Sequence, residues 1–422
     1  MALGLYISIP FCRTKCSYCN FASDVFSRAV FERYVDRVCV DVANAPQIAK
    51  EKGGQFEHEV DTIYLGGGTP TVLDASQLRR VFDAVRQQFQ VSLDAEVTVE
   101  CAPGTLSAGM IEALLTCGVN RVSLGVQSFV DVEAAAVGRL HERSTVLDDI
   151  ARLRAAGIYN INIDLIAGLP HQTAATWQES VEETLATGVP HVSVYMLEVD
   201  EDSRLGREVI AGGTRYHAHF VPNEEATADF YLAACERLEA ADIEQYEISN
   251  FARAGSQSHH NLKYWTRQPY LGFGVDAHSM LVSALPDAEA VRFAAADVLE
   301  KYIAGSLSDS ALVSQTAALE EIFFLGLRLN RGVSLRQIAA SFGQQVVENL
   351  RPAMEQLIAD KLLEETSDRI QLTARGRLLS NEVFQAFLAP VDLLPKPQVS
   401  PAVAISKPSG RLGEASRLAE TQ

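Results

Sequence analysis

Six short apolar, β-branched runs alternate with amphipathic stretches along the first half of the chain. The runs are Leu5–Pro10, Val60–Leu65, Glu96–Cys101, Arg121–Val126, Asn160–Ile166 and His191–Leu197. The stretches with helical periodicity are Ala75–Phe89, Ser107–Cys117, Thr145–Ala156 and Ala174–Thr187. Strands that alternate with helices predict an α/β fold with a parallel sheet. A Rossmann sheet is the alternative, although the glycine turn and following helix that it needs are not seen after the first run.

The next part of the chain has a less regular pattern. Residues Arg204–Phe220 are rich in Gly, Arg and His and predict a long loop, and Glu224–Ala241 has a helical pattern. Ile243–Phe251 is typical of a seventh strand. The glycine-rich Tyr270–Ser279 predicts a strand and a loop that close the open side of the sheet.

Residues 306–388 predict a separate small domain. Three predicted helices and a hairpin are typical of a winged helix. The helices are Leu319–Leu329, a helix from Ser334 to Gly343, and Val346–Asp360, and the hairpin strands are Leu362–Glu365 and Arg369–Thr373. Such a domain often binds DNA through its third helix. The stretch carries eight Lys/Arg and ten Asp/Glu, a net charge of −2, whereas a duplex-binding module needs a basic face. We therefore expect packing or partner docking, and no nucleic acid.

Composition narrows the class of protein further. The chain has 422 residues, 47% of them hydrophobic, and a net charge of −18, which disfavours polyanionic partners. No run of 18 apolar residues exists, so no transmembrane segment is expected, and no signal peptide precedes the first strand. Seven cysteines, three of them in one short motif, fit a reducing cytoplasm better than a disulfide scaffold. Residues 389–422, rich in Pro, Ala and Ser, predict a disordered tail.

Three cysteines follow the first predicted strand within eight residues. Cys12, Cys16 and Cys19 have the spacing C-x3-C-x2-C, and the other four cysteines are far apart in sequence. Thiolates at this density suit zinc or an iron–sulfur cluster. Structural zinc normally needs a fourth protein ligand, and no further pair follows. Three thiolates can hold three irons of a [4Fe–4S] cluster and leave the fourth iron open.

This triplet resembles that of the radical S-adenosylmethionine (SAM) enzymes, in the branch that contains the HemN-type dehydrogenases and the HemW-type haem chaperones. The similarity runs from Gly4 to Leu388. It implies a partial (β/α)6 barrel with its site at the carboxyl ends of the strands, and a HemN-type C-terminal domain. The domains expected are a radical SAM core at 1–230, a barrel-closing segment at 231–305, a winged-helix-like domain at 306–388 and the tail at 389–422.

Glycines, amides and acids stand where the predicted strands end. Gly66-Gly67-Gly68-Thr69-Pro70 follows the second strand, and by itself it predicts a tight turn equally well. The resemblance implies that this loop and strand-end residues hold SAM, with Arg139 on its carboxylate. The candidates are Tyr6, Gly67, Gly68, Thr69, Glu100, Gln127, Arg139 and Asp164. The family usually has Asn after Glu-x; here the stretch reads Glu100-Cys101-Ala102-Pro103, so that contact is lost.

A histidine-aromatic motif follows the seventh predicted strand. His260-Asn261-Leu262-Lys263-Tyr264-Trp265 contains an imidazole and two rings, and His259 precedes it. The residues alone favour a turn packed against the barrel edge, while an imidazole beside aromatics also suits haem. The resemblance implies a haem site, because the stretch matches the H-N-x-x-Y-W motif of HemW. His260, Tyr264 and Trp265 are therefore the candidate haem-binding residues.

The cysteine triplet predicts a [4Fe–4S] cluster, and the resemblance implies a protein that also binds SAM and carries haem to haem proteins. The alternative is an oxygen-independent coproporphyrinogen III dehydrogenase. HemN-type dehydrogenases carry a further cysteine two residues after the triplet, where this chain has Phe21, and a longer segment before it. A DNA-binding regulator is disfavoured by the charge. Whether the chain is an enzyme therefore stays open at this point.

Overall fold

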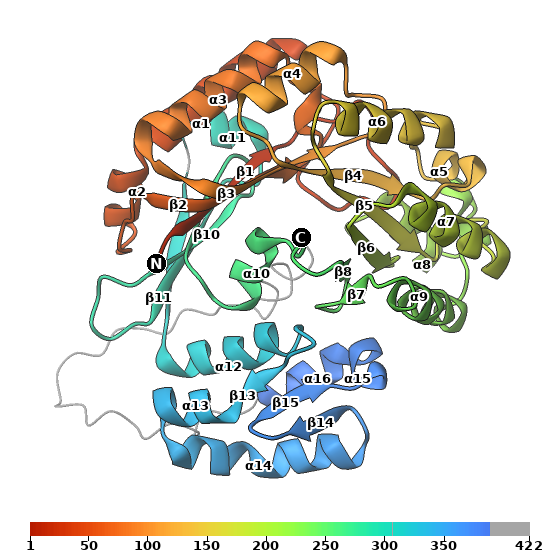
Figure 1. Ribbon diagram of the computed structural model, residues 1–422. Coiled ribbons are helices and arrows are strands. Elements are labelled where there is room, and N and C mark those ends of the chain that lie inside the picture. Colours follow the sequence, from red (N-terminus) through yellow and green to blue (C-terminus); the bar gives the residue numbers. More distant parts are fainter. Residues whose placement is uncertain (306, 389–422) are drawn as a thin grey trace. The chain divides into compact units, whose positions relative to one another are not determined.

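The computed structural model describes residues 1–305 and 307–388, and the predicted tail lies outside them. Two compact units divide between Val313 and Ser314. Figure 1 shows the helices and strands of both. No helix within the described ranges is long and apolar enough to cross a membrane.

The first unit is built on one curved sheet of twelve described strands. Its centre consists of six parallel strands that are neighbours in chain order. They are β1 (Leu3–Ile9), β2 (Glu59–Gly67), β3 (Gln90–Cys101), β4 (Arg121–Gln127), β5 (Asn160–Ala167) and β6 (His191–Met196). Each overlaps one of the six predicted runs, and the predicted α/β barrel is confirmed.

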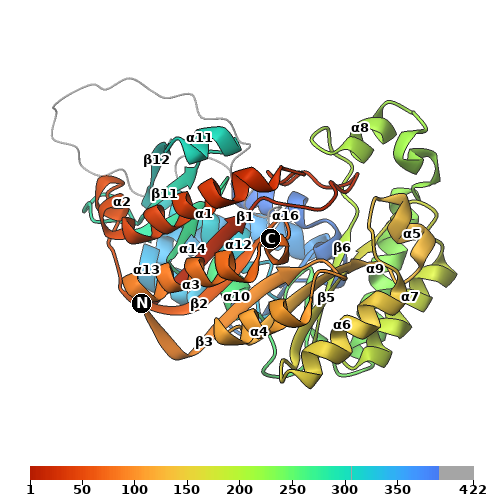
Figure 2. The same cartoon turned by 90° about the horizontal axis from the view of Figure 1, so that it is seen from above.

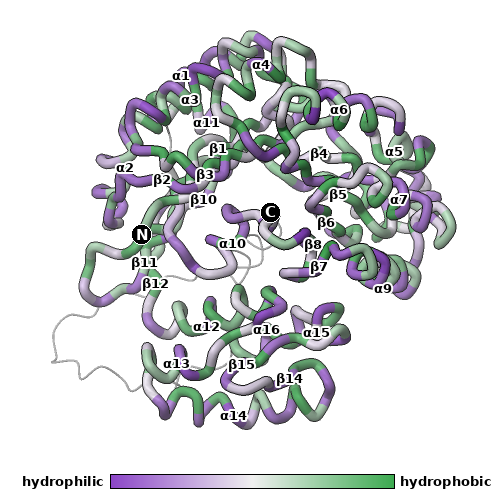
Figure 3. Tube along the Cα trace, in the orientation of Figure 1, coloured by the Kyte–Doolittle hydropathy of each residue, from purple (hydrophilic) through white to green (hydrophobic). Residues whose placement is uncertain are grey.

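Helices cover the convex face of this sheet (Figure 1). The helices between successive central strands form the crossover connections that parallel pairing requires. The helices and 3₁₀ turns of this part are α1 (Arg28–Ala43), α2 (Ala45–Glu51), η1 (Pro70–Val72), α3 (Ala75–Gln88), α4 (Ala108–Thr116), α5 (Asp131–Ala136), α6 (Arg143–Ala155), α7 (Ala174–Thr187), α8 (Arg204–Ile210), η2 (Arg215–Phe220) and α9 (Glu224–Glu239). Hydrophobic and hydrophilic stretches alternate along the outer helices in Figure 3, as expected for elements with one buried side.

Further strands extend this sheet at both edges: β9 pairs parallel with β1, whereas the strands beyond β9 and those on the other edge pair antiparallel with their neighbours. On one side lie β9, β10, β11 and β12, and on the other β8 and β7, so the barrel stays open. The elements of this part are β7 (Glu244–Gln245), β8 (Asn250–Ala252), α10 (His259–Trp265), β9 (Tyr270–Phe273), β10 (His278–Val282), β11 (Ala290–Ala295), α11 (Leu299–Ile303) and β12 (Leu307–Val313). Helix α10 lies on the concave side of the sheet (Figure 1).

Two predictions of local structure were wrong. The seventh strand expected at Ile243–Phe251 is a short hairpin, because Glu247 accepts hydrogen bonds from Ser249 and Asn250 and turns the chain back. The loop expected at Arg204–Phe220 contains α8, which Ser203 caps by accepting from the Gly206 amide at 2.8 Å. Figure 2 shows α8 on the same side of the barrel as the loop after β1.

Alternation along the central strands separates two faces. Apolar residues such as Ile7, Ile63 and Leu124 are fully or almost fully buried in the sheet. The alternate positions are polar and contact one another and α10, as the Thr62–His260 and Ser123–Asp164 hydrogen bonds show. Barrel interiors are usually filled by branched apolar side chains. A polar interior therefore indicates ligand binding at the cost of apolar packing.

The second unit has the three helices and the hairpin that the sequence predicted, and three further elements, namely β13, α15 and α16. Its elements are α12 (Gln315–Gly326), β13 (Val333–Ser334), α13 (Leu335–Phe342), α14 (Gln344–Ala359), β14 (Leu363–Thr366), β15 (Arg369–Leu372), α15 (Ala374–Leu378) and α16 (Ser380–Phe387). The strands form a three-stranded sheet in the order β13-β15-β14. Ser334 caps α13 by accepting from the Gln337 amide at 3.2 Å. Phe323 stacks on Phe387 at 4.5 Å between ring centroids and forms part of the core.

Candidate functional site

The cysteine loop, residues 12–19, begins where β1 ends. Cys16 is 8% exposed, Cys12 and Cys19 are half-buried, and all three are free thiols. The Cys12 amide donates to the Asp24 carbonyl at 3.0 Å, and the Ser17 amide donates to that of Val137 at 3.1 Å. These bonds hold the loop against the carboxyl end of the sheet, although it forms no regular element.

Charges around the loop suit thiolates bound to metal. Burial raises the pKa of both the Cys12 and the Cys19 thiols, and the Lys15 ammonium opposes this rise at Cys19. Bound metal favours deprotonation, so metal binding would offset the cost of burial. Within the described ranges no three His, Cys, Asp or Glu side chains converge on a single metal ion. An iron–sulfur cluster instead bridges separate thiolates, each on its own iron.

The glycine loop needs its glycines for close contacts. A Cβ on Gly66 would meet the Glu100 carboxyl at 2.7 Å, and one on Gly68 would meet the Ile9 carbonyl at 2.7 Å. Gly67 has a φ of +91°, which side chains strongly disfavour. Its amide donates to Glu100 Oε2 at 3.2 Å. The loop therefore joins β1, β2 and β3 at one edge.

Two acids occupy neighbouring positions on the polar face. Tyr64 Oη donates to Glu100 Oε1 at 2.8 Å. Asp164 accepts from Asn162 Nδ2 at 2.7 Å and from Ser123 Oγ at 3.1 Å. Burial, with a contribution from the Asp164 charge, raises the pKa of Glu100 to about 7. Burial also raises the pKa of Asp164. Both carboxyls therefore accept hydrogen bonds from neutral donors, and none of these partners is a cation.

Arg139 lies between the cysteine loop and β4. Its Nη1 is 3.7 Å from Cys16 Sγ, and its Nη2 donates to the Gly125 carbonyl. Its Nε is buried and has no hydrogen-bond partner in the described part of the chain. Gln127 ends β4 with a φ of 71°. Cations near thiolates lower the cost of holding their charge, so Arg139 suits a metal-bound Cys16.

The histidine motif forms α10 and is tied to the start of the strands. His260 is 1% exposed; its Nδ1 lies 2.9 Å from Thr62 Oγ1 and its Nε2 lies 2.8 Å from Tyr264 Oη. The His259 and His260 amides donate to the Glu96 carboxylate at 3.0 Å each. Burial, then the nearby positive charges, lowers the pKa of His260 to about 3. His260 is therefore neutral, with both ring nitrogens engaged.

The candidate residues thus fall into two connected groups. The first group lies on the strands and the loops after them, where Thr69 lies 3.9 Å from Cys12 Sγ and Arg139 lies 3.7 Å from Cys16 Sγ. Its members are Tyr6, Gly67, Gly68, Thr69, Glu100, Gln127, Arg139 and Asp164. His260, Tyr264 and Trp265 form the second group on α10, where Trp265 is 3% exposed. The ring of Tyr64 connects the groups, since it lies 5.3 Å from the His260 ring and binds Glu100.

Sequence reasoning missed several polar residues of the barrel interior. Tyr64, Ser123 and Asn162 bind the candidate acids directly. His191 contacts Asn162 at 2.6 Å and Tyr246 at 2.9 Å. The polar alternation in Asn160-Ile161-Asn162-Ile163-Asp164 was a usable signal, because every second residue of a strand shares one face.

The fold and this site together define a radical SAM protein. Residues 6–184 match the model of the radical SAM superfamily, and residues 313–379 match that of the HemN C-terminal domain. Coproporphyrinogen III oxidase (HemN) from Escherichia coli shares the fold, with a TM-score of 0.78, 22% identity, and coverage of 92% of this chain and 90% of that one.

Curated relatives narrow the class further. The haem chaperone HemW of Bacillus subtilis is 36% identical over 91% of this chain and 98% of its own. HemW of Escherichia coli is 31% identical over 92% of this chain and 98% of its own. The chain belongs to the HemW family.

Proposed function

We propose that this protein is a haem chaperone that binds haem and delivers it to haem proteins. The observation that carries this proposal is the match to HemW of Bacillus subtilis, which spans 98% of that relative. The alternative, a coproporphyrinogen III dehydrogenase, has only the fold of HemN in its favour. Phe21, where HemN-type dehydrogenases have a further cysteine, also favours the chaperone.

Membership of the radical SAM class implies a [4Fe–4S] cluster and SAM. Cys12, Cys16 and Cys19 would hold the cluster, which with three protein thiolates keeps one iron open for a further ligand. Supporting features are the burial of Cys16 and the guanidinium of Arg139 beside it. The orphaned Nε of Arg139 supports a role in ligand binding, because a buried unpaired donor is costly.

Residues around the glycine loop would hold SAM. Glu100 and Asp164 present carboxylate oxygens that can accept from ribose hydroxyls, and the glycines permit close approach of the backbone. Arg139 suits a carboxylate, because its planar guanidinium can donate two parallel hydrogen bonds. Tyr6, Gln127 and Thr69 complete the proposed set.

Helix α10 is the proposed haem element. The rings of His260 and Tyr264 lie 5.0 Å apart, and the buried Trp265 follows in the same helix, which supports an aromatic site for a porphyrin. Coordination of iron by His260 requires that its ring give up the bond to Thr62 or to Tyr264. His259 is exposed and is the alternative ligand.

The remaining parts of the proposal concern partners and place. We place the protein in the cytoplasm, where the cysteine loop stays reduced. The radical SAM core at 1–230, the barrel-closing segment at 231–305 and the HemN-type domain at 306–388 are the proposed domains. The acidic balance of the last of these supports protein docking and no nucleic-acid partner. The recipients are unidentified haem-accepting proteins.

Anaerobic reconstitution of the cluster, followed by three parallel assays, tests the proposal. We expect binding of haem and its transfer to an apo-acceptor, with little or no cleavage of SAM and no conversion of coproporphyrinogen III to protoporphyrinogen IX. An oxidative radical reaction needs a shielded substrate. Robust product formation would replace the chaperone with the dehydrogenase, and absence of haem binding would reject the chaperone.

A further inference from the structure

Residues 204–220, which we call the rim segment, hold a group of histidines and aromatics that the proposed function does not use. The segment comprises α8 and η2, and follows β6. His217 and His219 are exposed, and the rings of Tyr216 and Phe220 are 39% and 48% exposed. Tyr216 and His217 both have positive φ angles, of 55° and 61°. Such angles are strained in ordinary residues and concentrate at functional sites.

His171, in the turn after β5, is bound to this segment. Its Nε2 lies 3.0 Å from Nδ1 of His217, and its backbone amide donates to the Phe220 carbonyl at 3.0 Å. The Phe220 ring contacts two imidazoles, with its centroid 4.1 Å from that of His171 and 4.0 Å from that of His219. The Arg204 guanidinium lies 5.7 Å from the centre of the Tyr216 ring.

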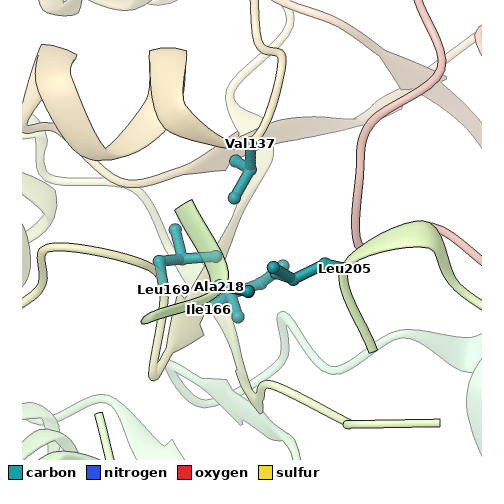
Figure 4. Packing of buried hydrophobic residues seen from close by; sticks show 5 residues of the cluster. All are labelled: Val137, Ile166, Leu169, Leu205 and Ala218. Atoms are coloured by element: carbon teal, nitrogen blue, oxygen red, sulfur yellow. The ribbon is translucent and has the colours of Figure 1, made fainter. Parts of the chain in front are cut away.

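An apolar cluster fixes the rim segment beside the cysteine loop. Figure 4 shows its members, which are Val137, Ile166, Leu169, Leu205 and Ala218. Tyr18, from within the cysteine loop, packs against it. The Leu205 amide donates to the Ser17 carbonyl at 2.8 Å, and Arg204 donates to the Lys15 carbonyl. The apolar cluster therefore holds the rim segment, with its histidines, beside the cysteine loop that is proposed to bind the iron–sulfur cluster.

We propose that the rim segment and His171 form an exposed haem site, in which Nε2 of His217 binds the iron and His171 positions the ring. In this arrangement Nδ1–H of His217 donates to Nε2 of His171, which leaves the lone pair of His217 on Nε2. Histidines that bind metals usually donate their other ring nitrogen to an acceptor in this way. The inference rests on the proposed function, because haem is the ligand.

Haem is the ligand that these residues fit best. A porphyrin supplies four nitrogens, so one protein imidazole suffices for its iron. This agrees with the lack of any three-ligand metal group among residues 1–305 and 307–388. Tyr216 and Phe220 offer exposed rings for the porphyrin edge, and Arg215 is an exposed cation on the same segment for a propionate.

The two proposed haem sites differ in how accessible their histidines are to a ligand. His260 is 1% exposed with both ring nitrogens engaged, whereas His217 is exposed and only its Nδ1 has a partner in the described structure. A chaperone must release its haem to another protein, and an exposed ligand permits this.

Titration of the full-length, reconstituted protein with ferric haem tests the site. The variants are His217→Ala and His171→Ala, each also made in the His260→Ala background. His58→Ala is the matched control, because His58 is an exposed histidine that packs against Phe56 elsewhere. The readouts are the Soret spectrum, the haem stoichiometry and, after reduction, the iron–histidine stretching band. Circular dichroism and cluster absorbance check the fold.

We expect His217→Ala to abolish the haem that remains bound in the His260→Ala protein, and added imidazole to restore it. His171→Ala should weaken binding about 10- to 100-fold and lower the iron–histidine frequency, as loss of an orienting partner does. Unchanged haem binding by His217→Ala, with haem still bound by the unmodified protein, overturns this inference and leaves the proposed function intact. An unmodified protein that binds no haem overturns both.

Discussion

Replacement of Glu100 by Gln should change how the stability of the protein depends on pH. Glutamine has nearly the same shape. Its oxygen can accept from the Gly67 amide while its NH2 group donates to the Tyr64 hydroxyl, so the substitution removes mainly the charge. The pKa of Glu100 rises from 4.5 to about 7, mainly through burial. A carboxyl with a raised pKa binds its proton more tightly in the folded state than in the unfolded state. Its contribution to stability is therefore full below the unfolded pKa and is lost as pH rises through about 7.

The size of the effect follows from the shift. A shift of about 2.5 pKa units corresponds to roughly 3.4 kcal/mol at about 1.36 kcal/mol per unit. The Glu100 side chain is partly exposed, so solvent screens part of this and about 1–3 kcal/mol is expected. Relative to the unmodified protein, Glu100→Gln should gain this amount between about pH 5 and about pH 8.5.

Urea unfolding of the cluster-free protein across this pH range measures the difference. A constant offset from the new amide cancels, because only the slope of the difference with pH is used. Glu57→Gln, at an exposed position, is the control and should show no slope of this size. A Glu100→Gln difference that stays constant from about pH 5 to about pH 8.5 would refute the assignment of a raised pKa to this carboxyl.

Three further predictions follow from the site and its proposed cofactors. Alanine at Cys12, Cys16 or Cys19 should abolish the visible absorption and iron content of the reconstituted cluster, whereas Cys39→Ala, Cys117→Ala and Cys235→Ala should preserve both; a normal cluster in Cys16→Ala protein contradicts the assignment. Alanine at Glu100, Arg139 or Asp164 should weaken SAM binding about 10- to 100-fold in calorimetric titrations, since a buried hydrogen bond to a charged group contributes about 1.5–3 kcal/mol; three unchanged affinities place SAM elsewhere. His260→Ala should reduce the free energy of unfolding by about 1–3 kcal/mol, because Thr62 and Tyr264 lose a buried partner; His259→Ala, at an exposed position, is its control, and equal stability of the two variants rejects the reasoning.

The central strands could be predicted because their sequence pattern and their environment agree. Each parallel strand is covered by helices on one face, which makes its apolar residues conspicuous. The rim segment was harder, because α8 is only seven residues long and depends on the Ser203 cap and on Leu205 packing into a distant cluster. The hairpin in place of the seventh strand depends on Glu247, whose bonds to Ser249 and Asn250 no periodicity reveals.

Some parts of the site can be predicted from residue types alone, whereas other parts become clear only from the geometry of the folded chain. The spacing of the three cysteines by itself predicts a loop that binds zinc or an iron–sulfur cluster, because clustered thiolates suit such centres. The chemical role of a histidine depends instead on what its two nitrogens contact. His260 carries the recognisable motif, yet Thr62 and Tyr264 engage both of its nitrogens. His217 lies in a stretch without a motif, is exposed, and contacts His171 through Nδ1. A motif therefore locates the element, and the hydrogen bonds around each ring decide which imidazole can reach an iron first.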